Sequence, residues 1–403
     1  MTQTKEKFQN TNTKRLIGQI EGKRKGPTVI FFGGIHGNEM AGVKALELVF
    51  EELRKPTFEM YGAIFGIRGN IPAQLKNRRF LDQDLNRLWT TTQIAKIMAK
   101  PKLELSSEEN ELSEIYELLL ELLETKSPPF YFIDFHTTSS KSLPFITIND
   151  AMINRKFSRL FPVPTILGIE EYLEGPLLSH MNEKGYVALG FESGQHVERQ
   201  AVTNSIAFTW LCLVFAGFIE KKDVLDYYTY YQQLLTAAEG NVHFYEVIYR
   251  QPLLALDDFK MNQGFQNFQE IEKGTLLAVL NDQTIKAEKN TILFMPLYQE
   301  QGEEGFFLIR RTPKSALWLS AFLRKIKFDS FLVLLPGISW SNDKKESLLV
   351  NVSVARYYAK SIFHLLGYRN RSVDKNAILM QNRERTAKTK MYKRERWYKN
   401  ELP

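Results

Sequence analysis

The segment Thr28-Val-Ile-Phe-Phe-Gly-Gly-Ile-His36-Gly-Asn-Glu39 changes from an apolar run to a glycine-rich loop. The β-rich residues 28–32 predict a buried strand, and the glycines after them permit a tight turn and a close backbone approach to a ligand. We expect His36 and Glu39 to lie one turn apart, where a helix begins at about Asn38. Both side chains therefore belong to the loop that leaves this strand.

A second apolar run, Pro129 to Phe135, ends on His136 and is followed by Thr-Thr-Ser-Ser. This pattern is typical of a buried strand. Asp134 lies two residues before His136, so both side chains face the same side of the strand. We expect Asp134 to hold the imidazole of His136 in the tautomer that a metal ligand needs.

Two imidazoles and a carboxylate at strand ends form a candidate metal site. Catalytic Zn²⁺ takes three protein ligands and leaves a fourth position for water, and His, Glu, His is a recurring set. The sequence therefore predicts one zinc ion per chain, held by His36, Glu39 and His136. Taken alone, each histidine also fits a hydrogen-bonded structural role, because imidazole serves many functions.

The composition is that of an ordinary globular protein. The chain has 403 residues, 44% of them hydrophobic and 25% charged, so we expect two or more units of about 100 to 200 residues. The single cysteine, Cys212, excludes a disulfide within the chain. Residues 1–10 lack the apolar stretch of a signal peptide, and no apolar run reaches the length of about 18 residues that spans a membrane. We expect a cytoplasmic enzyme.

Periodicity predicts an α/β fold with a mixed, mostly parallel sheet flanked by helices, over a catalytic domain of residues 14–235. Ligands of open α/β sheets gather beyond the carboxyl ends of strands, where both candidate segments lie. Ser106 and Glu109 form a capping box at a helix start. The predicted strands are Thr28 to Phe32, Gly62 to Ile67, Phe130 to His136 and Val187 to Phe191, and the clearest helices are Met40 to Arg54 and Glu108 to Glu124.

The sequence pattern changes after about Gly240, where short β runs alternate with turns. Residues 240–312 are predicted to form a small β domain, with strands over His243 to Tyr249 and Thr291 to Phe294. Residues 313–403 are predicted to form a helical extension with two amphipathic helices, Ser315 to Ile326 and Leu348 to Leu366, and a basic tail.

Most of the net charge lies in that tail. The segment from Lys375 to Pro403 contains nine Lys and Arg residues and three Glu residues, whereas the net charge of the whole chain is +7. The rest of the chain is therefore nearly neutral. Such a tail can contact nucleic acid or anionic lipid, but we expect a solvated helical or frayed terminus.

Two further clusters offer catalytic groups. Gly190-Phe-Glu192-Ser-Gly194 places a carboxylate at the end of a predicted strand, where it can take a proton from an activated water and return it to a leaving amine. Residues 78–87 hold three arginines and Asn86, and arginine can bind a carboxylate or stabilise an oxyanion. A solvated cap and a solvated charged loop are the respective structural alternatives. Motifs of nucleophilic serine enzymes and of phosphate loops are missing.

Four motifs follow one another in a recognisable order: Gly-Gly-Ile-His-Gly-Asn-Glu, Arg-Phe-Leu-Asp-Gln-Asp-Leu-Asn-Arg, Asp-Phe-His-Thr-Thr and Phe-Glu-Ser-Gly. In order and spacing they resemble the succinylglutamate desuccinylase and aspartoacylase family, which is related to the zinc carboxypeptidases. The motifs cover residues 28–196, and residues 240–311 resemble the C-terminal domain of that family more loosely. Residues 313–403 have no counterpart in its usual layout.

The resemblance implies roles for matching residues. His36, Glu39 and His136 fit the zinc ligands, Glu192 fits the general base and acid, and Arg79 fits the group that polarises the scissile carbonyl. Asn86 and Arg87 match a pair that binds a substrate carboxylate in the family. The implied activity is zinc-dependent removal of an acyl group from a small N-acylated amino acid.

Two alternatives accompany this interpretation. One is a zinc carboxypeptidase that acts on a peptide end, and the other is an inactive binding protein that uses its basic tail. Intact His36, Glu39, His136 and Glu192 argue against the second, because a scaffold does not need all four. We expect a small-molecule substrate and neither a membrane span nor a nucleic-acid partner, and a homo-oligomer is compatible with this interpretation.

Overall fold

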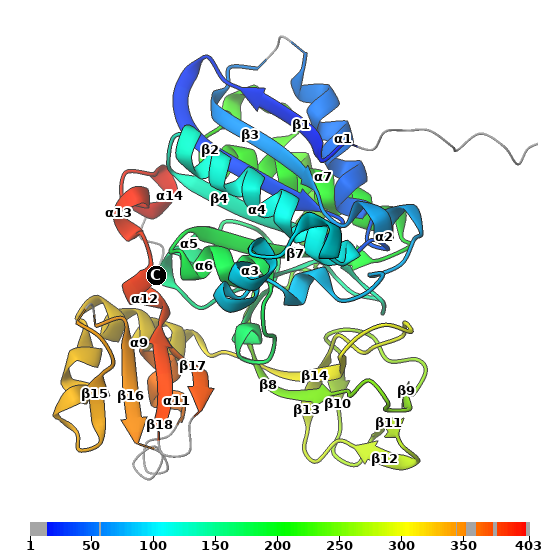
Figure 1. The fold of residues 1–403 in the computed structure, drawn as a ribbon, viewed down its shortest axis with the longest axis vertical. Helices are drawn as coiled ribbons and strands as arrows, with labels where there is room; N and C mark the ends of the chain where they lie inside the picture. The colour runs from blue at the N-terminus through cyan, green and yellow to red at the C-terminus, as the bar shows by residue number, and fades with distance from the viewer. Residues whose placement is uncertain (1–13, 56–57, 344, 352–359, 374–376, 400–403) are drawn as a thin grey trace, which may run out of the picture.

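The structure is a computed structural model that describes residues 14–55, 58–343, 345–351, 360–373 and 377–399. Two sequence predictions fall partly or wholly outside these residues: the lack of a signal peptide over 1–10, and the middle of the helix expected over 348–366. Figure 1 shows that the described elements are arranged around one large sheet, with a smaller sheet on each side of its lower strands.

The large sheet has eleven described strands, and the predicted mixed α/β sheet is confirmed. Its inner neighbours β3, β2, β4 and β7 run parallel, and the pairs toward both edges are mostly antiparallel. In spatial order the strands are β1 (Leu16–Glu21), β3 (Tyr61–Arg68), β2 (Arg24–Gly33), β4 (Phe130–Thr138), β7 (Val187–Gln195), β5 (Phe145–Ile148), β6 (Thr165–Leu167), β8 (Phe244–Pro252), β14 (Glu304–Arg311), β13 (Thr291–Phe294) and β10 (Glu270–Ile271).

Helices cover both faces of the parallel strands, so each strand is apolar on both sides. Along β2, Val29 and Phe31 join the core on one face, whereas Ile30 and Phe32 join the core on the other. The first face is covered by α1 (Ala41–Leu53), α5 (Met152–Ser158), α7 (Arg199–Ala216) and, beyond α7, α8 (Tyr227–Ala237). The second face is covered by α3 (Thr91–Met98), α4 (Ser107–Thr125) and α6 (Leu177–Glu183).

The predicted helices are present, with one shift that affects the site. The capping box of Ser106 and Glu109 at the start of α4 is confirmed. However, α1 begins at Ala41 and not at about Asn38. His36 and Glu39 therefore lie in a turn before the helix, which is closed by a 3.1 Å hydrogen bond from the Glu39 N–H to the His36 carbonyl.

The β-rich region after residue 240 extends the large sheet. Strand β8 pairs in parallel with β6, and β14 pairs with β8, so the sheet continues across the expected domain boundary. A separate three-stranded sheet contains β9 (Phe259–Met261), β11 (Leu276–Leu280) and β12 (Gln283–Lys286). The division into residues 14–235, 240–312 and 313–403 stays a prediction.

The C-terminal segment contains the first expected helix, the end of the second, and also a sheet that was not predicted from the sequence. Helices α9 (Lys314–Lys325) and α11 (Lys360–Leu365) accompany four antiparallel strands, in the order β15 (Ile338–Trp340), β16 (Ser347–Asn351), β18 (Ala377–Asn382) and β17 (Tyr368–Val373). The helix expected from Leu348 is wrong at its start. Residues 347–351 alternate between buried and more exposed positions, which is the period of a strand.

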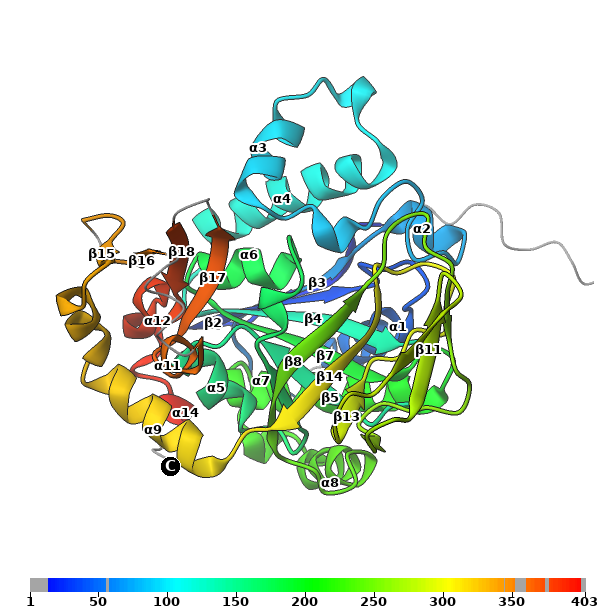
Figure 2. The ribbon, with the colours of Figure 1, turned by 90° about the horizontal axis from the view of Figure 1, so that it is seen from below.

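Figure 2 shows this C-terminal unit and the sheet that contains β11 on opposite sides of β8 and β14. None of the helices formed by the described residues combines the length and hydrophobicity needed to cross a bilayer.

The basic tail is folded onto the catalytic part of the chain. It forms the short helices α12 (Arg383–Thr386), α13 (Thr389–Tyr392) and α14 (Arg396–Lys399), which Figure 1 shows in red beside α5. The Tyr392 hydroxyl donates to the Phe130 carbonyl at 2.5 Å, and the Trp397 indole donates to the Tyr131 hydroxyl at 3.0 Å. The expected helical character of the tail is therefore confirmed, whereas the expectation that it is solvated or frayed is wrong, because Tyr392 and Trp397 are buried.

Candidate active site

The loop that carries His36 and Glu39 is held tightly against its neighbours. Gly34 has φ +71°, which favours glycine, and a Cβ at Gly37 would lie 2.3 Å from the Ala73 carbonyl carbon. The Gly37 N–H donates to the Arg79 carbonyl at 3.0 Å. This contact brings the loop of Arg79 beside that of His36.

Strands β4 and β7 place His136 and Glu192 side by side. The two residues are partners in the parallel register, and Asp134 lies on the same face two residues earlier. This face is the one that α3, α4 and α6 cover, since Phe130 and Phe132 pack there. Alternation along two adjacent strands therefore directs these three polar side chains into one space.

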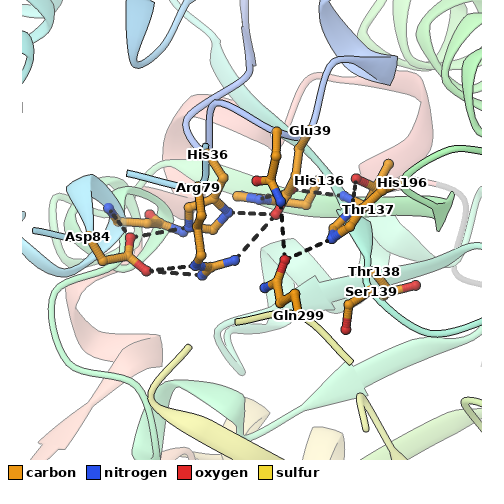
Figure 3. A network of polar contacts seen from close by, with 12 residues as sticks. His36, Glu39, Arg79, Asp84, His136, Thr137, Thr138, Ser139, His196 and Gln299 are labelled. Carbon is orange, nitrogen blue, oxygen red and sulfur yellow. Dashed lines mark hydrogen bonds and ion pairs between the residues drawn. The ribbon is translucent and has the colours of Figure 1, made fainter. Parts of the chain in front are cut away.

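The donor atoms of His36, Glu39 and His136 converge. One ligand atom from each lies within 4.8 Å of the other two, and in the described part of the chain no other such group of three is found. Nδ1 of His36 is 2.8 Å from one Glu39 oxygen, and Nδ1 of His136 is 3.1 Å from the other. Figure 3 shows both rings facing the Glu39 carboxylate.

The outer nitrogen of each ring faces a buried carboxylate. Nε2 of His136 is 2.8 Å from Asp134, and Nε2 of His36 is 3.2 Å from Asp84. A proton held on Nε2 leaves the Nδ1 lone pair for a metal. The set of two imidazoles and one carboxylate therefore fits a zinc ion.

The pKa values of the two glutamates at this site are shifted by burial and by the neighbouring imidazoles. Burial alone raises the pKa of Glu39, but the two imidazoles outweigh burial and hold this pKa well below its ordinary value. Glu39 is thus an anion, as a metal ligand must be. Burial raises the pKa of Glu192 to about 7, although the imidazole of His136 opposes this shift.

Glu192 has an oxygen without a partner. Its Oε2 atom is buried and makes no hydrogen bond to the described residues, although the residue lines the same cavity as His36 and His136. A buried acceptor without a partner is costly in a fold. Such an atom therefore marks a position where a substrate or a water is received.

The loop that carries Arg79 is fixed by a carboxylate from α4. Glu108 is fully buried and accepts hydrogen bonds from the N–H groups of Leu81, Asp82 and Gln83 and from the Asn70 amide, at 2.7–3.2 Å. The loop then turns back, so that Asp84 accepts from Arg79 at 3.0 Å.

Arg79 lies beside the converging donors. Its Nη1 is 3.4 Å from Glu39, and its Nε and Nη2 face Asp84. Burial alone lowers the pKa of Arg79, but Asp84 and Glu39 outweigh burial and raise it, so the guanidinium keeps its charge.

The predicted substrate-binding pair also lines the cavity, and both side chains have protein partners. The Asn86 amide oxygen accepts from the Leu177 N–H at 2.9 Å. The Arg87 guanidinium lies 3.0 and 3.2 Å from the two oxygens of Glu304. The structure therefore brings every predicted site residue except Asp134, which lies behind His136, to one cavity.

Comparison with known sequences identifies the domain that carries this site. The succinylglutamate desuccinylase/aspartoacylase catalytic domain matches residues 25–177, which include His36, Glu39, Arg79 and His136. Residues 25–177 are therefore similar to the catalytic domain of the succinylglutamate desuccinylase/aspartoacylase family. Glu192 lies beyond the matched residues.

Curated relatives match over a short part of their length. A succinylglutamate desuccinylase from Photorhabdus laumondii is 37% identical over 75 residues, which are 19% of this chain and 22% of that protein. One from Burkholderia lata is 32% identical over 63 residues, 16% of this chain and 18% of that protein. The chain therefore matches only about a fifth of the length of these relatives.

Solved structures of the family share the fold over a longer stretch. The succinylglutamate desuccinylase/aspartoacylase from Rhodobacter sphaeroides has a TM-score of 0.54 at 16% identity and covers 73% of this chain and 88% of its own. The product-bound ectoine utilization protein EutE (DoeB) from Ruegeria pomeroyi has a TM-score of 0.52 at 17% identity, with the same coverage. At this identity the likeness concerns the fold alone.

Two cavity residues, His196 and Gln299, and Asp84, which contacts His36 and Arg79, were not predicted as site residues. Asp84 lies within the arginine-rich motif of residues 78–87, and His196 follows Glu192 by four residues. The His196 ring lies 2.7 Å from the Thr137 hydroxyl and 3.1 Å from Gln299, which comes from the loop before β14. No sequence signal pointed to Gln299, because its partners are far away in the chain (Figure 3).

Proposed function

We propose that the chain is a zinc-dependent hydrolase that cleaves the amide bond of a small N-acylated amino acid. One observation carries the proposal: His36, Glu39 and His136 direct their donor atoms at one point in a cavity that Glu192 and Arg79 also line. The catalytic domain that matches residues 25–177 supports the same chemistry, since it is named after a succinylglutamate desuccinylase and an aspartoacylase.

His36, Glu39 and His136 are the residues that would hold the zinc ion. When bound, zinc supplies Lewis-acid polarisation and lowers the pKa of a water molecule. Asp84 and Asp134 keep the two imidazoles in the tautomer that exposes Nδ1.

Glu192 is the proposed general base and acid. Its partnerless oxygen accepts a proton from the attacking water and later delivers that proton to the departing nitrogen. A pKa raised to about 7 suits both transfers near neutral pH.

Arg79 is the proposed oxyanion partner. Its guanidinium is charged and held by Asp84, so it is oriented before substrate arrives. Donors fixed in this way stabilise a developing negative charge without reorganisation. Asn86 and Arg87 are the proposed substrate-binding pair. The cytoplasmic location of the protein stays a prediction.

The test is metal analysis combined with hydrolysis of a panel of N-acyl amino acids and short peptides. We expect about one zinc per chain in the wild type and in Glu192→Gln, with turnover lower by roughly a hundredfold or more in the variant. Glu124→Gln, which changes an exposed carboxylate on α4, serves as the matched control and should keep full turnover. Protein that binds no metal, or undiminished turnover in Glu192→Gln, would refute the mechanism.

A further inference from the structure

Helix α9 carries an apolar stripe that faces solvent. Trp318, Phe322 and Ile326 are spaced four residues apart, so they lie along one face of the helix, with Leu319 beside them. The exposed fractions of these four side chains range from 40% to 61%, and the rings of Trp318 and Phe322 stack with 5.7 Å between their centroids. Figure 2 shows α9 at the outer edge of the molecule, on the side away from β11.

A second apolar stripe follows directly in the chain. In the 3₁₀ helix η5 (Phe328–Leu334), the exposed side chains Phe328, Phe331 and Leu334 recur every three residues, which aligns them on one face. Among the residues that the structure describes, every exposed tryptophan and phenylalanine lies between positions 318 and 331. Such a concentration of exposed apolar side chains marks an interaction site.

The exposed charges of this segment are all positive. Lys314 and Lys325 lie four residues before and seven residues after Trp318, so they share its face of the helix, and Lys327 lies between α9 and η5. The only carboxylate between residues 313 and 334, that of Asp329, is buried and paired with an arginine of α12. The segment therefore exposes apolar and cationic side chains but no anionic one.

A cleft lined by lysines lies beside the end of α9. Its two described carboxylates, Asp329 and Glu384, already accept hydrogen bonds from Arg385 and from the Met152 N–H. Four lysines of the cleft are exposed and form no ion pair with the described residues, namely Lys325, Lys327, Lys390 and Lys393. The cleft therefore adds positive charge next to the apolar stripes.

We propose that residues 314–334 dock on the surface of an anionic lipid bilayer, with α9 lying along the membrane plane. The apolar side chains enter the boundary between head groups and acyl chains, and the lysines bind the lipid phosphates. Tryptophan fits this position because its ring has an apolar body and a polar N–H. The inference goes beyond the proposed deacylase function and does not depend on it.

A second copy of the chain matches this face less well. A twofold dimer places the same surface of each copy against the other. The lysines of the two copies would then meet across an interface to which residues 313–334 bring no exposed carboxylate. Like charges that face each other across an interface oppose binding, whereas an anionic bilayer supplies the missing negative charge.

The test is sedimentation of the full chain with lipid vesicles. One set of vesicles contains phosphatidylcholine alone, and the other contains equal parts of phosphatidylcholine and phosphatidylglycerol. The apolar double variant combines Trp318→Ala with Phe322→Ala. Its matched control combines Leu254→Ala with Leu256→Ala, which removes two exposed apolar side chains elsewhere.

A second pair of variants tests the lysines. Lys325→Gln with Lys327→Gln removes two charges from the proposed surface, and Lys23→Gln with Lys25→Gln removes two exposed charges elsewhere. All the replaced side chains are exposed, so we expect all four double variants to unfold at the temperature of the wild type.

We expect the wild type to bind the mixed vesicles at least about tenfold more tightly than phosphatidylcholine vesicles. The apolar variant should bind the mixed vesicles at least about tenfold more weakly than the wild type. The lysine variant should lose roughly tenfold or more, because each lysine near the bilayer contributes about fivefold. Both controls should bind like the wild type.

Tryptophan fluorescence locates the contact. Trp89, Trp210 and Trp397 are buried, whereas Trp318 is 61% exposed. Brominated lipids in the mixed vesicles should therefore quench the wild type. Trp318→Phe keeps an apolar ring, so this variant should still bind but should lose the quenching.

Several results would overturn the inference. These are no preference of the wild type for the mixed vesicles, undiminished binding by the apolar or the lysine variant, and quenching that persists in Trp318→Phe. A dimer, measured by light scattering, that ignores vesicles and dissociates in the apolar variant would also overturn it, because a second copy would then cover this face.

Discussion

The two histidines of the site are fixed by what their outer nitrogens touch. His136 faces Asp134 at 2.8 Å, and His36 faces Asp84 at 3.2 Å. Asp134 is completely buried, and its second oxygen has no partner among the described residues. Among the described residues, the hydrogen bonding of the Asp134 carboxylate therefore serves only to orient one imidazole.

This contact predicts a measurable effect on metal binding. Replacement Asp134→Asn keeps the shape but removes the charge that holds the Nε2 proton of His136. We expect zinc affinity to fall by about 10- to 100-fold, measured by competition with a chromophoric chelator. Asp226→Asn, at an exposed position, should bind zinc like the wild type. Equal affinity in both variants would show that Asp134 has no such role.

The individual residues that could be predicted from sequence are those close together in the chain. His36 and Glu39 are three apart, and Asp134 and His136 are two apart, so one turn or one strand relates them. Asp84 is 48 residues from His36, and Gln299 is 261 residues from Asn38. Such contacts arise from tertiary packing, which local spacing does not encode.

At the level of elements, long apolar runs were predictable and short ones were not. Strands β2, β4 and β7 carry apolar residues on both faces, because helices cover both sides. Strands β5 and β6 have only four and three residues and were missed. Three or four residues contain at most two periods of strand alternation, which is too few to distinguish a strand from a loop, so pairing in the sheet decides them.

Glu108 shows how one helix positions a catalytic loop. It presents its carboxylate to three backbone N–H groups of residues 81–83 and to Asn70. The loop that places Arg79 and Asp84 therefore depends on α4. Its position follows from the capping box, which sets where α4 begins.

Replacement Glu108→Gln should loosen this anchor. A glutamine turns one acceptor into a donor that faces backbone donors, so we expect a loss of roughly 1.5–3 kcal/mol of stability. Thermal unfolding followed by circular dichroism measures this change, with the exposed Glu117→Gln on the same helix as control. A transition midpoint equal to that of the control would contradict the anchoring role.

At the scale of the whole molecule, the C-terminal unit is bound to the catalytic part of the chain by ion pairs with one buried aspartate, Asp150. Asp150 follows β5 and accepts from Arg324 of α9 at 2.8 Å and from Arg369 of β17 at 3.0 Å, besides the nearby Arg155. Its neighbour Asn149 lines the cavity. The unit thus supports the far wall of the site.

Burial alone raises the pKa of Asp150, but the three arginines outweigh burial and hold it well below its ordinary value. A carboxylate with a lowered folded-state pKa stabilises the fold above its unfolded pKa of about 3.9 and loses that contribution as the pH falls further. The contribution is therefore complete at neutral pH.

We expect Asp150→Asn to lower stability by about 3–5 kcal/mol at pH 7, because three buried cations lose their anion. The difference from the wild type should stay constant above about pH 5 and shrink below about pH 4. Urea unfolding between pH 3.5 and 7 measures it, with the exposed Asp343→Asn as control. A difference that grows toward acid pH would disprove the assignment.

The contacts between the C-terminal tail and β4 can form only long after β4 has been synthesised. Tyr392 is completely buried against Phe130, a residue 262 positions earlier in the chain. At a synthesis rate of about 5–20 residues per second, roughly 13–50 s pass between the synthesis of Phe130 and that of Tyr392. During that interval the aromatic side chains at the start of β4 lack their final cover, so the nascent chain depends on other contacts to stay soluble until its last helices arrive.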